Sequence, residues 1–233
     1  MIYKNVCKGI FLKRPNRFIA HVLIHKKEEI CHVKNTGRCK ELLIPGCTVY
    51  LEDCRYNTNR KTGYDIIAVE KKLPDGTSLL INMDSQAPNK VVYEWIQKGN
   101  LFPSHVQLKS EVTYGNSRFD LFAAYDDIQA FMEVKGVTLE ENGIVRFPDA
   151  PTQRGVKHIY ELIDSIKNGY KAYLFFVIQM PRAAYFEPNI ATQPEFGEAL
   201  CAARKAGVKL LAYTCQVTAN SMTVDAPVPI KLM

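Results

Sequence analysis

The chain has 233 residues, long enough to bury a sizeable core and to hold one or two domains. A composition of 47% hydrophobic and 23% charged residues, without low-complexity tracts, excludes the fibrous and disordered classes. Lys4 and Lys8 lie near the N-terminus and no long apolar run follows. We therefore expect no signal peptide, no membrane span and no membrane partner, and a cytoplasmic location.

The net charge of +6 is concentrated in the first third of the chain. Residues 1–83 carry 15 Lys/Arg and 8 Asp/Glu, a net +7, whereas residues 84–233 carry 15 and 16, a net −1. A basic module joined to a near-neutral one favours a polyanionic partner for the first module. The seven cysteines show no C-x2-4-C spacing and are expected to be reduced thiols. His32 beside Cys31 leaves a metal site as a less favoured alternative.

Residues 1–83 are predicted to form a small β-barrel. Turn signals such as Pro45-Gly46 separate short runs of strand-forming residues. The predicted strands are 17–24, 29–33, 47–51, 64–70 and 78–81, with a loop at 35–38. Strands at this spacing suggest the oligonucleotide-binding (OB) barrel, the commonest small barrel that binds nucleic acids.

Residues 84–233 are predicted to form a mixed α/β domain that follows a linker at 84–88. Its element order is α-β-β-β-α-β-α-β, and the last strand–helix–strand steps imply parallel crossovers. The predicted elements are a helix from Pro88 to Gly99, strands at 111–114, 118–125 and 128–139, the last of which bends at 141–143 into 144–147, a helix from 151 to about 169, a strand at 172–178, a helix from Pro194 to Gly207 and a final strand at 208–213.

The hairpin over 118–135 carries the most informative polar residues. A turn at Asp126-Asp127 places Asp120 directly opposite Glu133, and strand alternation puts Lys135 on the same face. Opposed carboxylates weaken a hairpin unless something neutralises them, and a divalent cation with oxygen ligands would do so. The alternative is that all three are solvated charges on an exposed sheet face.

The helix that begins at 151–152 adds two further polar candidates. Gln153 and Lys157 are four residues apart and share a face, from which they could reach a phosphate or a metal-bound water. Arg154 and His158 form a neighbouring pair, which we interpret as ordinary solvent-facing residues.

These residues resemble a known pattern. Asp120 followed by Glu133-Val134-Lys135 is similar to the D…E-x-K core of the PD-(D/E)XK nuclease-like superfamily, although Phe119 stands where that superfamily has proline. Runs at 35–38, 111–120 and 147–158 resemble the signatures of the sugar fermentation stimulation protein family, and the resemblance spans nearly the whole chain. It implies an OB-like barrel over 1–83, a restriction-endonuclease-like mixed sheet over 84–233, and DNA binding without marked sequence preference.

The resemblance also implies roles for individual residues. Asp120 and Glu133 would hold Mg²⁺ or Mn²⁺, with Glu111 as an added acid, and Lys135 would orient the attacking water. Gln153 and Lys157 would steady the phosphate. Asp149 is expected to assist the start of the following helix. No organic cofactor and no covalent nucleophile are expected.

In the barrel, basic residues are the candidates for phosphate contacts and aromatic residues for base stacking. They are Arg17, Arg38, Lys40, Arg60 and Lys61, together with Tyr50, Tyr56 and Tyr64. Any single tyrosine is more often a core or surface-filling residue, and Arg38 is the leading candidate because the Gly37-Arg38 turn would present it on a loop. Our leading hypothesis is a DNA-binding protein, with a regulatory role as one form of it. The alternative is an active Mg²⁺- or Mn²⁺-dependent nuclease acting on DNA or RNA, single strands included. A third, a partner of a sugar enzyme, rests on the family's name alone.

Overall fold

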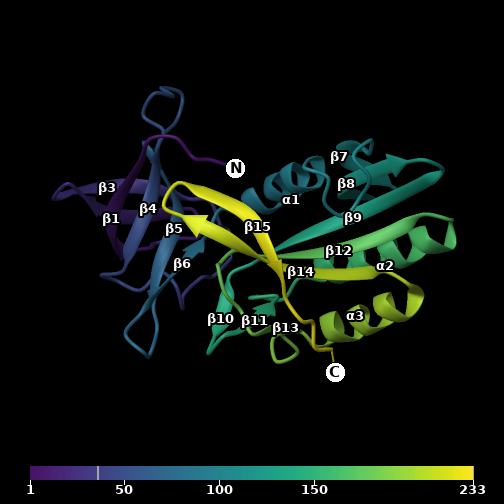
Figure 1. Cartoon of the computed structure of the whole chain (residues 1–233). Coiled ribbons are helices and arrows are strands. Elements are labelled where there is room, and N and C mark those ends of the chain that lie inside the picture. The colour runs from purple at the N-terminus through teal and green to yellow at the C-terminus, as the bar shows by residue number, and fades with distance from the viewer. Residues whose placement is uncertain (36, 233) are drawn as a thin grey trace.

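The structure is a computed structural model that describes residues 1–35 and 37–232, so Thr36 of the predicted 35–38 loop lies outside the described residues. Figure 1 shows a β-barrel on the left and a helix-flanked sheet on the right. No helix in the described part of the chain is long and apolar enough to cross a membrane.

The barrel is built from the first strands of the chain. They are β1 (Val6–Lys13), β2 (Ile19–Ile24), β3 (Lys27–Val33), β4 (Thr48–Asp53), β5 (Tyr64–Lys72) and β6 (Ser78–Asn82). Neighbouring strands pair in the order β3-β2-β1-β4-β5-β6, and a parallel β3–β5 contact closes the ring. The pairing of β1 with both β2 and β4, together with this parallel closure, is the connectivity of an OB barrel.

The second sheet is mixed and carries helices on both faces. Its strands run in the order β15-β14-β12-β9-β8-β7, with β9, β12 and β14 parallel. Their bounds are β7 (Gln107–Tyr114), β8 (Ser117–Tyr125), β9 (Ile128–Val137), β12 (Lys171–Ile178), β14 (Lys209–Thr218) and β15 (Ser221–Pro227). A smaller sheet joins β10 (Leu139–Glu141), β11 (Ile144–Phe147) and β13 (Tyr185–Pro188).

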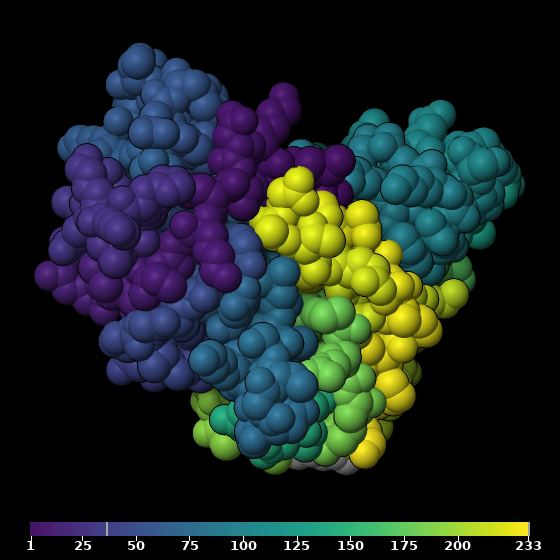
Figure 2. Space-filling view, turned by 60° about the vertical axis from the view of Figure 1, so that its left-hand side comes forward, coloured from purple at the N-terminus to yellow at the C-terminus, as the bar shows by residue number. Residues whose placement is uncertain are grey.

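Three helices cover this sheet in the described residues: α1 (Ala87–Gln97), α2 (Gln153–Lys167) and α3 (Pro194–Ala206). The buried face of α1 packs on one side of the sheet, where Val92 meets Phe175 in a core that we call the α1-side core. The α2-side core on the other face includes Ile159 and Phe176, and it continues without a break into the barrel interior. In Figure 2 the purple-to-blue barrel accordingly packs against the green and yellow segments of the second sheet.

The predicted linker at 84–88 starts at a buried polar junction around Asp84, while Ser85 and Gln86 are exposed. Asp84 is 1% exposed, and its carboxylate accepts hydrogen bonds from the Tyr3 hydroxyl at 3.1 Å and pairs with Lys34 Nζ at 2.7 Å. Gln179, which follows β12, donates to the Asp84 carbonyl at 3.1 Å. Because these bonds join the barrel to the sheet, the junction fixes the two parts to each other.

Several strands differ from the predicted elements. Strand β1 was not predicted, because Gly9 interrupts its apolar pattern; a Cβ at Gly9 would lie 2.5 Å from Val22 Cγ1, so the close approach of β1 and β2 requires glycine. Strands β13 and β15 were also not predicted: β13 has only four residues, which alternate between half-buried and buried, and β15 is exposed over much of its length. Edge strands of this kind lack the continuous apolar run by which a buried strand is recognised.

The register of the β8–β9 hairpin is as predicted. Leu121 pairs with Met132 and Tyr125 with Ile128, which sets Asp120 opposite Glu133. Strand alternation, however, breaks at Asp120: Phe119 and Phe122 both lie in the α2-side core, with Leu121 in the α1-side core. Because regular alternation would send 119 and 122 to opposite faces, the strand is irregular at the position of the candidate carboxylate.

Candidate functional site

Asp120, Glu133 and Lys135 come together at the end of the β8–β9 ladder, and we call them the carboxylate site. The ladder ends at Leu121 and Met132, and beyond it the Asp120 Oδ2 atom accepts the backbone N–H of Val134 at 2.7 Å. The Asp120 Oδ1 atom accepts from Asn89 of α1 at 2.7 Å. The carboxylate thus replaces a main-chain carbonyl between two strands that no longer pair.

Glu133 is 3% exposed and is held through one oxygen only. Its Oε1 atom accepts from Lys135 Nζ at 2.5 Å and from His158 Nδ1 at 2.5 Å. Its Oε2 atom is buried without a hydrogen-bond partner. Burial by itself would raise the pKa of Glu133, but the bonds from His158 and Lys135 outweigh it and hold the pKa below its usual range. Glu133 is therefore an anion with one free oxygen.

The pKa of Asp120 is shifted in the opposite direction to that of Glu133. Burial, and after it the negative charge of Glu133, raise the pKa of the Asp120 carboxyl, while the Val134 N–H and Lys135 oppose the rise. This coupling shows that the two carboxylates and the ammonium group act on one another. A cation between the carboxylates would offset the charge of Glu133, the second of these two causes.

We expect Asp120→Asn to stabilise the metal-free protein. Asparagine keeps the shape and can still accept from Val134, and it removes a charge that the fold disfavours, as the raised pKa of Asp120 shows. At neutral pH the variant should melt higher by the ~2–4 °C that ~1 kcal/mol produces in a chain of this size. The gain should vanish as the pH falls through the raised pKa, because the wild-type carboxyl is then neutral too. Thermal melts in EDTA at neutral pH, and at an acidic pH below the raised pKa of Asp120, test this. A variant that melts at a lower temperature than the wild type at neutral pH would contradict it.

Glu111 lies across the other edge of β8. The pairs Ser110–Leu121 and Val112–Phe119 place it opposite Asp120, and it has a positive φ of 56°. Its carboxylate is exposed and pairs loosely with Arg118 at 3.5 Å. Glu111 and Asp120 line a cavity of about 530 Å³ whose other walls come mainly from the start of α1. The remaining lining residues are Ser85, Gln86, Asn89, Lys90, Tyr93 and Ser110.

The residue by which helix α2 contacts the carboxylate site is His158, not Gln153 or Lys157. Gln153 is exposed, and Lys157 donates to the Asn116 carbonyl at 3.1 Å and pairs with Glu161 at 3.6 Å. The interpretation of His158 as solvent-facing was wrong, because it is 4% exposed and bonded to Glu133. The sequence contains the signal that we missed: His158 and Leu162 share the buried stripe of the helix.

Asp149 does not assist the start of α2. The helix is capped by Thr152, whose side chain accepts the Gly155 N–H at 3.0 Å. The Asp149 carboxylate instead accepts the backbone N–H of Arg38 at 3.1 Å, across to the barrel. A Cβ at Gly37 would lie 2.5 Å from Asp149 Oδ2, so this contact requires glycine.

A second site, the basic pocket, lies where the β1–β2 loop of the barrel meets the segment that includes Arg38. It has a volume of about 630 Å³. Its charged lining residues are Lys13, Arg14, Arg17, Arg38 and Lys40, with no acid among the lining residues. Within residues 1–35 and 37–232, Arg17, Arg38 and Lys40 are exposed and form no ion pair. Three of the five predicted basic residues therefore share one pocket.

Arg14 organises the loops of the basic pocket. Its guanidinium donates to the carbonyls of Arg17 at 2.6 Å, of Asn35 at 2.8 Å and of Arg38 at 2.8 Å. Because all three acceptors are backbone carbonyls, Arg14 keeps its positive charge unneutralised while it fixes the position of its neighbours. Arg14 was not among the basic residues predicted from the sequence.

The other barrel candidates lie in or beside the β4–β5 loop. Arg60 forms an ion pair with Asp65, so its charge is less available to a phosphate than that of Arg17. Lys61 is exposed. Among the tyrosines, Tyr56 is 75% exposed, but Tyr64 is 6% exposed. Tyr64 is therefore a core residue, the alternative that the sequence favoured for any single aromatic residue, and it is not placed to stack on bases.

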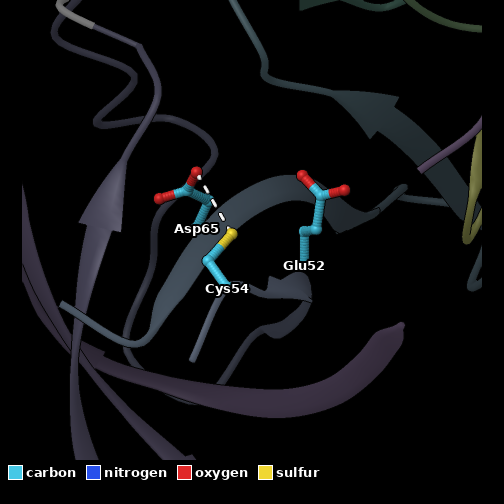
Figure 3. A group of neighbouring side chains, drawn as sticks. All are labelled: Glu52, Cys54 and Asp65. Carbon is cyan, nitrogen blue, oxygen red and sulfur yellow. Dashed lines mark hydrogen bonds between the residues drawn. The ribbon is translucent and has the colours of Figure 1, made fainter. Parts of the chain in front are cut away.

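The barrel also holds a group of potential metal ligands, drawn in Figure 3. Glu52, Cys54 and Asp65 each offer an atom within 4.8 Å of the others. The Asp65 carboxylate is already satisfied by Arg60 and by His32 Nδ1 at 3.1 Å. Burial, aided by Asp65, raises the pKa of the Cys54 thiol to about 11, so it stays protonated at neutral pH. All seven cysteines are free thiols. The free oxygen of Glu133 makes the carboxylate site the better match for a cation.

Known proteins and family models are similar to this chain over nearly its whole length. Two family models match: the SfsA N-terminal OB domain over residues 12–96, and the sugar fermentation stimulation protein RE domain over residues 86–221. Sugar fermentation stimulation protein homologs of Ruminiclostridium cellulolyticum and Clostridium beijerinckii are 55% and 54% identical over 232 and 224 residues, covering 100% and 96% of both chains.

A solved structure, that of SfsA from Pyrococcus furiosus in complex with Ca²⁺, is similar throughout. It matches with a TM-score of 0.85 at 26% identity and covers 100% of this chain and 98% of its own. The predicted fold class, a mixed α/β protein with an N-terminal OB-like barrel, is confirmed. The chain belongs to the sugar fermentation stimulation protein (SfsA) family.

Proposed function

We propose that this protein binds DNA through the basic pocket of its barrel. The observation that supports this most directly is the pocket itself, lined by five Lys/Arg and no acid. Arg17, Arg38 and Lys40 present their charges to solvent, while Arg14 fixes the loops that carry them. Fixed cations with no internal counter-charge are suited to the phosphates of a nucleic acid backbone.

Contacts of this kind position a nucleic acid without reading its sequence. Guanidinium and ammonium groups on loops reach phosphates, whereas base readout needs an element that enters a groove. Binding without strong sequence preference follows. Phe18 is 49% exposed beside Arg17, which offers one surface for an unpaired base.

The salt dependence of binding tests the proposal. Affinity for two unrelated duplexes should be similar, and log K should fall with log salt by ~0.9 per phosphate contacted. Fluorescence anisotropy on the full chain measures this, with single-stranded DNA and duplex RNA in parallel to define the preferred partner. Binding that is absent, or that does not change between low and high salt, would refute it.

A second candidate function, a divalent-cation-dependent nuclease, is favoured by the carboxylate site. The free, buried Oε2 atom of Glu133 is explained if a hard cation with oxygen ligands binds there, and such a cation would also offset the charge that Glu133 places on Asp120. The Pyrococcus furiosus relative was solved in complex with Ca²⁺, which is such a cation. Asp120 and Glu133 would hold Mg²⁺ or Mn²⁺, which when bound polarises a phosphoryl oxygen.

The neighbouring side chains have roles in this nuclease hypothesis. Lys135 is close enough to orient an attacking water and to offset charge on the phosphate. The cavity beside Asp120 would receive the scissile phosphate, where Lys90 and Ser110 can bind its oxygens and Glu111 adds a third acid. Gln153 and Lys157, at the exposed start of α2, would contact the strand further along.

Cleavage assays with defined DNA and RNA substrates test the nuclease hypothesis. Mn²⁺ or Mg²⁺ should be required, and Lys135→Ala should abolish cleavage while leaving binding to the basic pocket within a few-fold. No cleavage of any substrate with either metal would remove the nuclease and leave the DNA-binding proposal standing. Cleavage by Lys135→Ala at the wild-type rate would point to a contaminating enzyme.

A further inference from the structure

The two oxygens of the Glu133 carboxylate have different surroundings. Oε1 receives two donors, Lys135 Nζ and His158 Nδ1, each at 2.5 Å. Oε2 is buried and has no hydrogen-bond partner. A buried carboxylate oxygen without a partner is costly, and such groups call for a specific explanation. Two donors on one oxygen fix the plane of the carboxylate and direct the other oxygen elsewhere.

His158 supplies the more rigid of those two donors. It is 4% exposed on the buried stripe of α2, and its ring lies edge-on to Phe119 with centroids 6.2 Å apart. An imidazole packed in this way has few alternative orientations. Lys135 donates from the end of a long side chain, so it fixes the carboxylate less well.

Arg154 determines which ring nitrogen of His158 carries the proton. Arg154 Nε donates to His158 Nε2 at 3.3 Å, so Nε2 is the acceptor. The proton of the neutral ring is then on Nδ1, from which it is donated to Glu133 Oε1. A chain of hydrogen bonds therefore runs from the exposed start of α2 through His158 to Oε1 of Glu133, the carboxylate whose other oxygen, Oε2, is free.

We propose that His158 is a positioning residue that holds Glu133 so that its Oε2 atom faces a divalent cation. The inference rests on the metal site proposed above and extends it to α2. The supporting partners of metal-binding side chains typically change metal affinity by ~10- to 100-fold. His158 itself touches neither the cation nor the substrate; it acts only through Glu133.

Mn²⁺ titration of the full-length protein by calorimetry tests this, because it reads metal affinity independently of cleavage. His158→Ala should weaken Mn²⁺ binding by ~10- to 100-fold. His158→Asn, whose amide NH₂ can occupy the place of Nδ1–H, should restore most of the affinity. Tyr160→Ala, on the same helix but 50% exposed, is the matched control and should bind as the wild type does. Melting temperatures in EDTA show whether each variant is folded.

Arg154→Ala tests the same chain without altering the core. Arg154 is exposed, so the variant should fold normally, and the loss of its bond to Nε2 should give a smaller decrease in Mn²⁺ affinity than His158→Ala gives. If His158→Ala folds and binds Mn²⁺ as the wild type does, or if His158→Asn loses as much affinity as His158→Ala, the positioning role is refuted. If the wild type itself binds no Mn²⁺, the proposed metal site fails instead.

Discussion

Replacing Arg17, Arg38 and Lys40 together by alanine should lower the affinity for duplex DNA by roughly two orders of magnitude at ~0.1 M salt. Each side chain is exposed, lines the basic pocket and has no ion-pair partner among the described residues, so each charge is available to a phosphate. The slope of log K against log salt should become shallower by about three, one for each lost contact. Anisotropy titrations at several salt concentrations measure both quantities.

A matched triple variant separates the pocket from overall charge. Lys98, Lys167 and Lys205 are exposed near the ends of α1, α2 and α3, and their replacement removes the same net charge away from the pocket. This control should lose only a few-fold in affinity. Equal losses in the two triple variants would show that diffuse charge, not the basic pocket, binds the DNA.

Glu133→Gln should reduce Mn²⁺ affinity by more than about 100-fold, beyond the ~10- to 100-fold that loss of a supporting residue costs. The reason is geometric as well as electrostatic. Lys135 and His158 both donate to the Oε1 position, so the glutamine carbonyl must occupy it. The amide NH₂ is then placed at the Oε2 position, where it presents hydrogens to the cation instead of a lone pair.

Calorimetry with Mn²⁺ checks this, with Glu141→Gln as the control because the Glu141 carboxylate is 62% exposed at the far end of β10. The control should bind Mn²⁺ as the wild type does. DNA affinity without metal should be unchanged within a few-fold in Glu133→Gln, because the basic pocket is formed by other residues. Undiminished Mn²⁺ binding by Glu133→Gln would place the metal elsewhere, with the group around Asp65 as the next candidate.

The sequence alone determined a large part of this protein. The apolar runs of β12 and β14 are local signals, and so are the Pro and Gly residues at the ends of α1 and α3. They gave the order of these elements, although the edge strand β15 was not predicted. The polar turn at Asp126-Asp127 set the hairpin register, because a short turn leaves little freedom in pairing. That register placed Asp120 opposite Glu133. The basic residues of the first module had also given Arg17, Arg38 and Lys40 as candidates for phosphate contacts.

Only the tertiary structure decided which side chains complete the sites. Arg60 and Arg17 are the same residue type on barrel loops, but Asp65, five residues after Arg60 at the start of β5, neutralises only Arg60. His158 becomes a partner of Glu133 because α2 packs on the irregular end of β8. The bond from His158 to Glu133 and the break in strand alternation depend on contacts between segments that are far apart in the chain, and a local sequence pattern does not specify which of these segments meet.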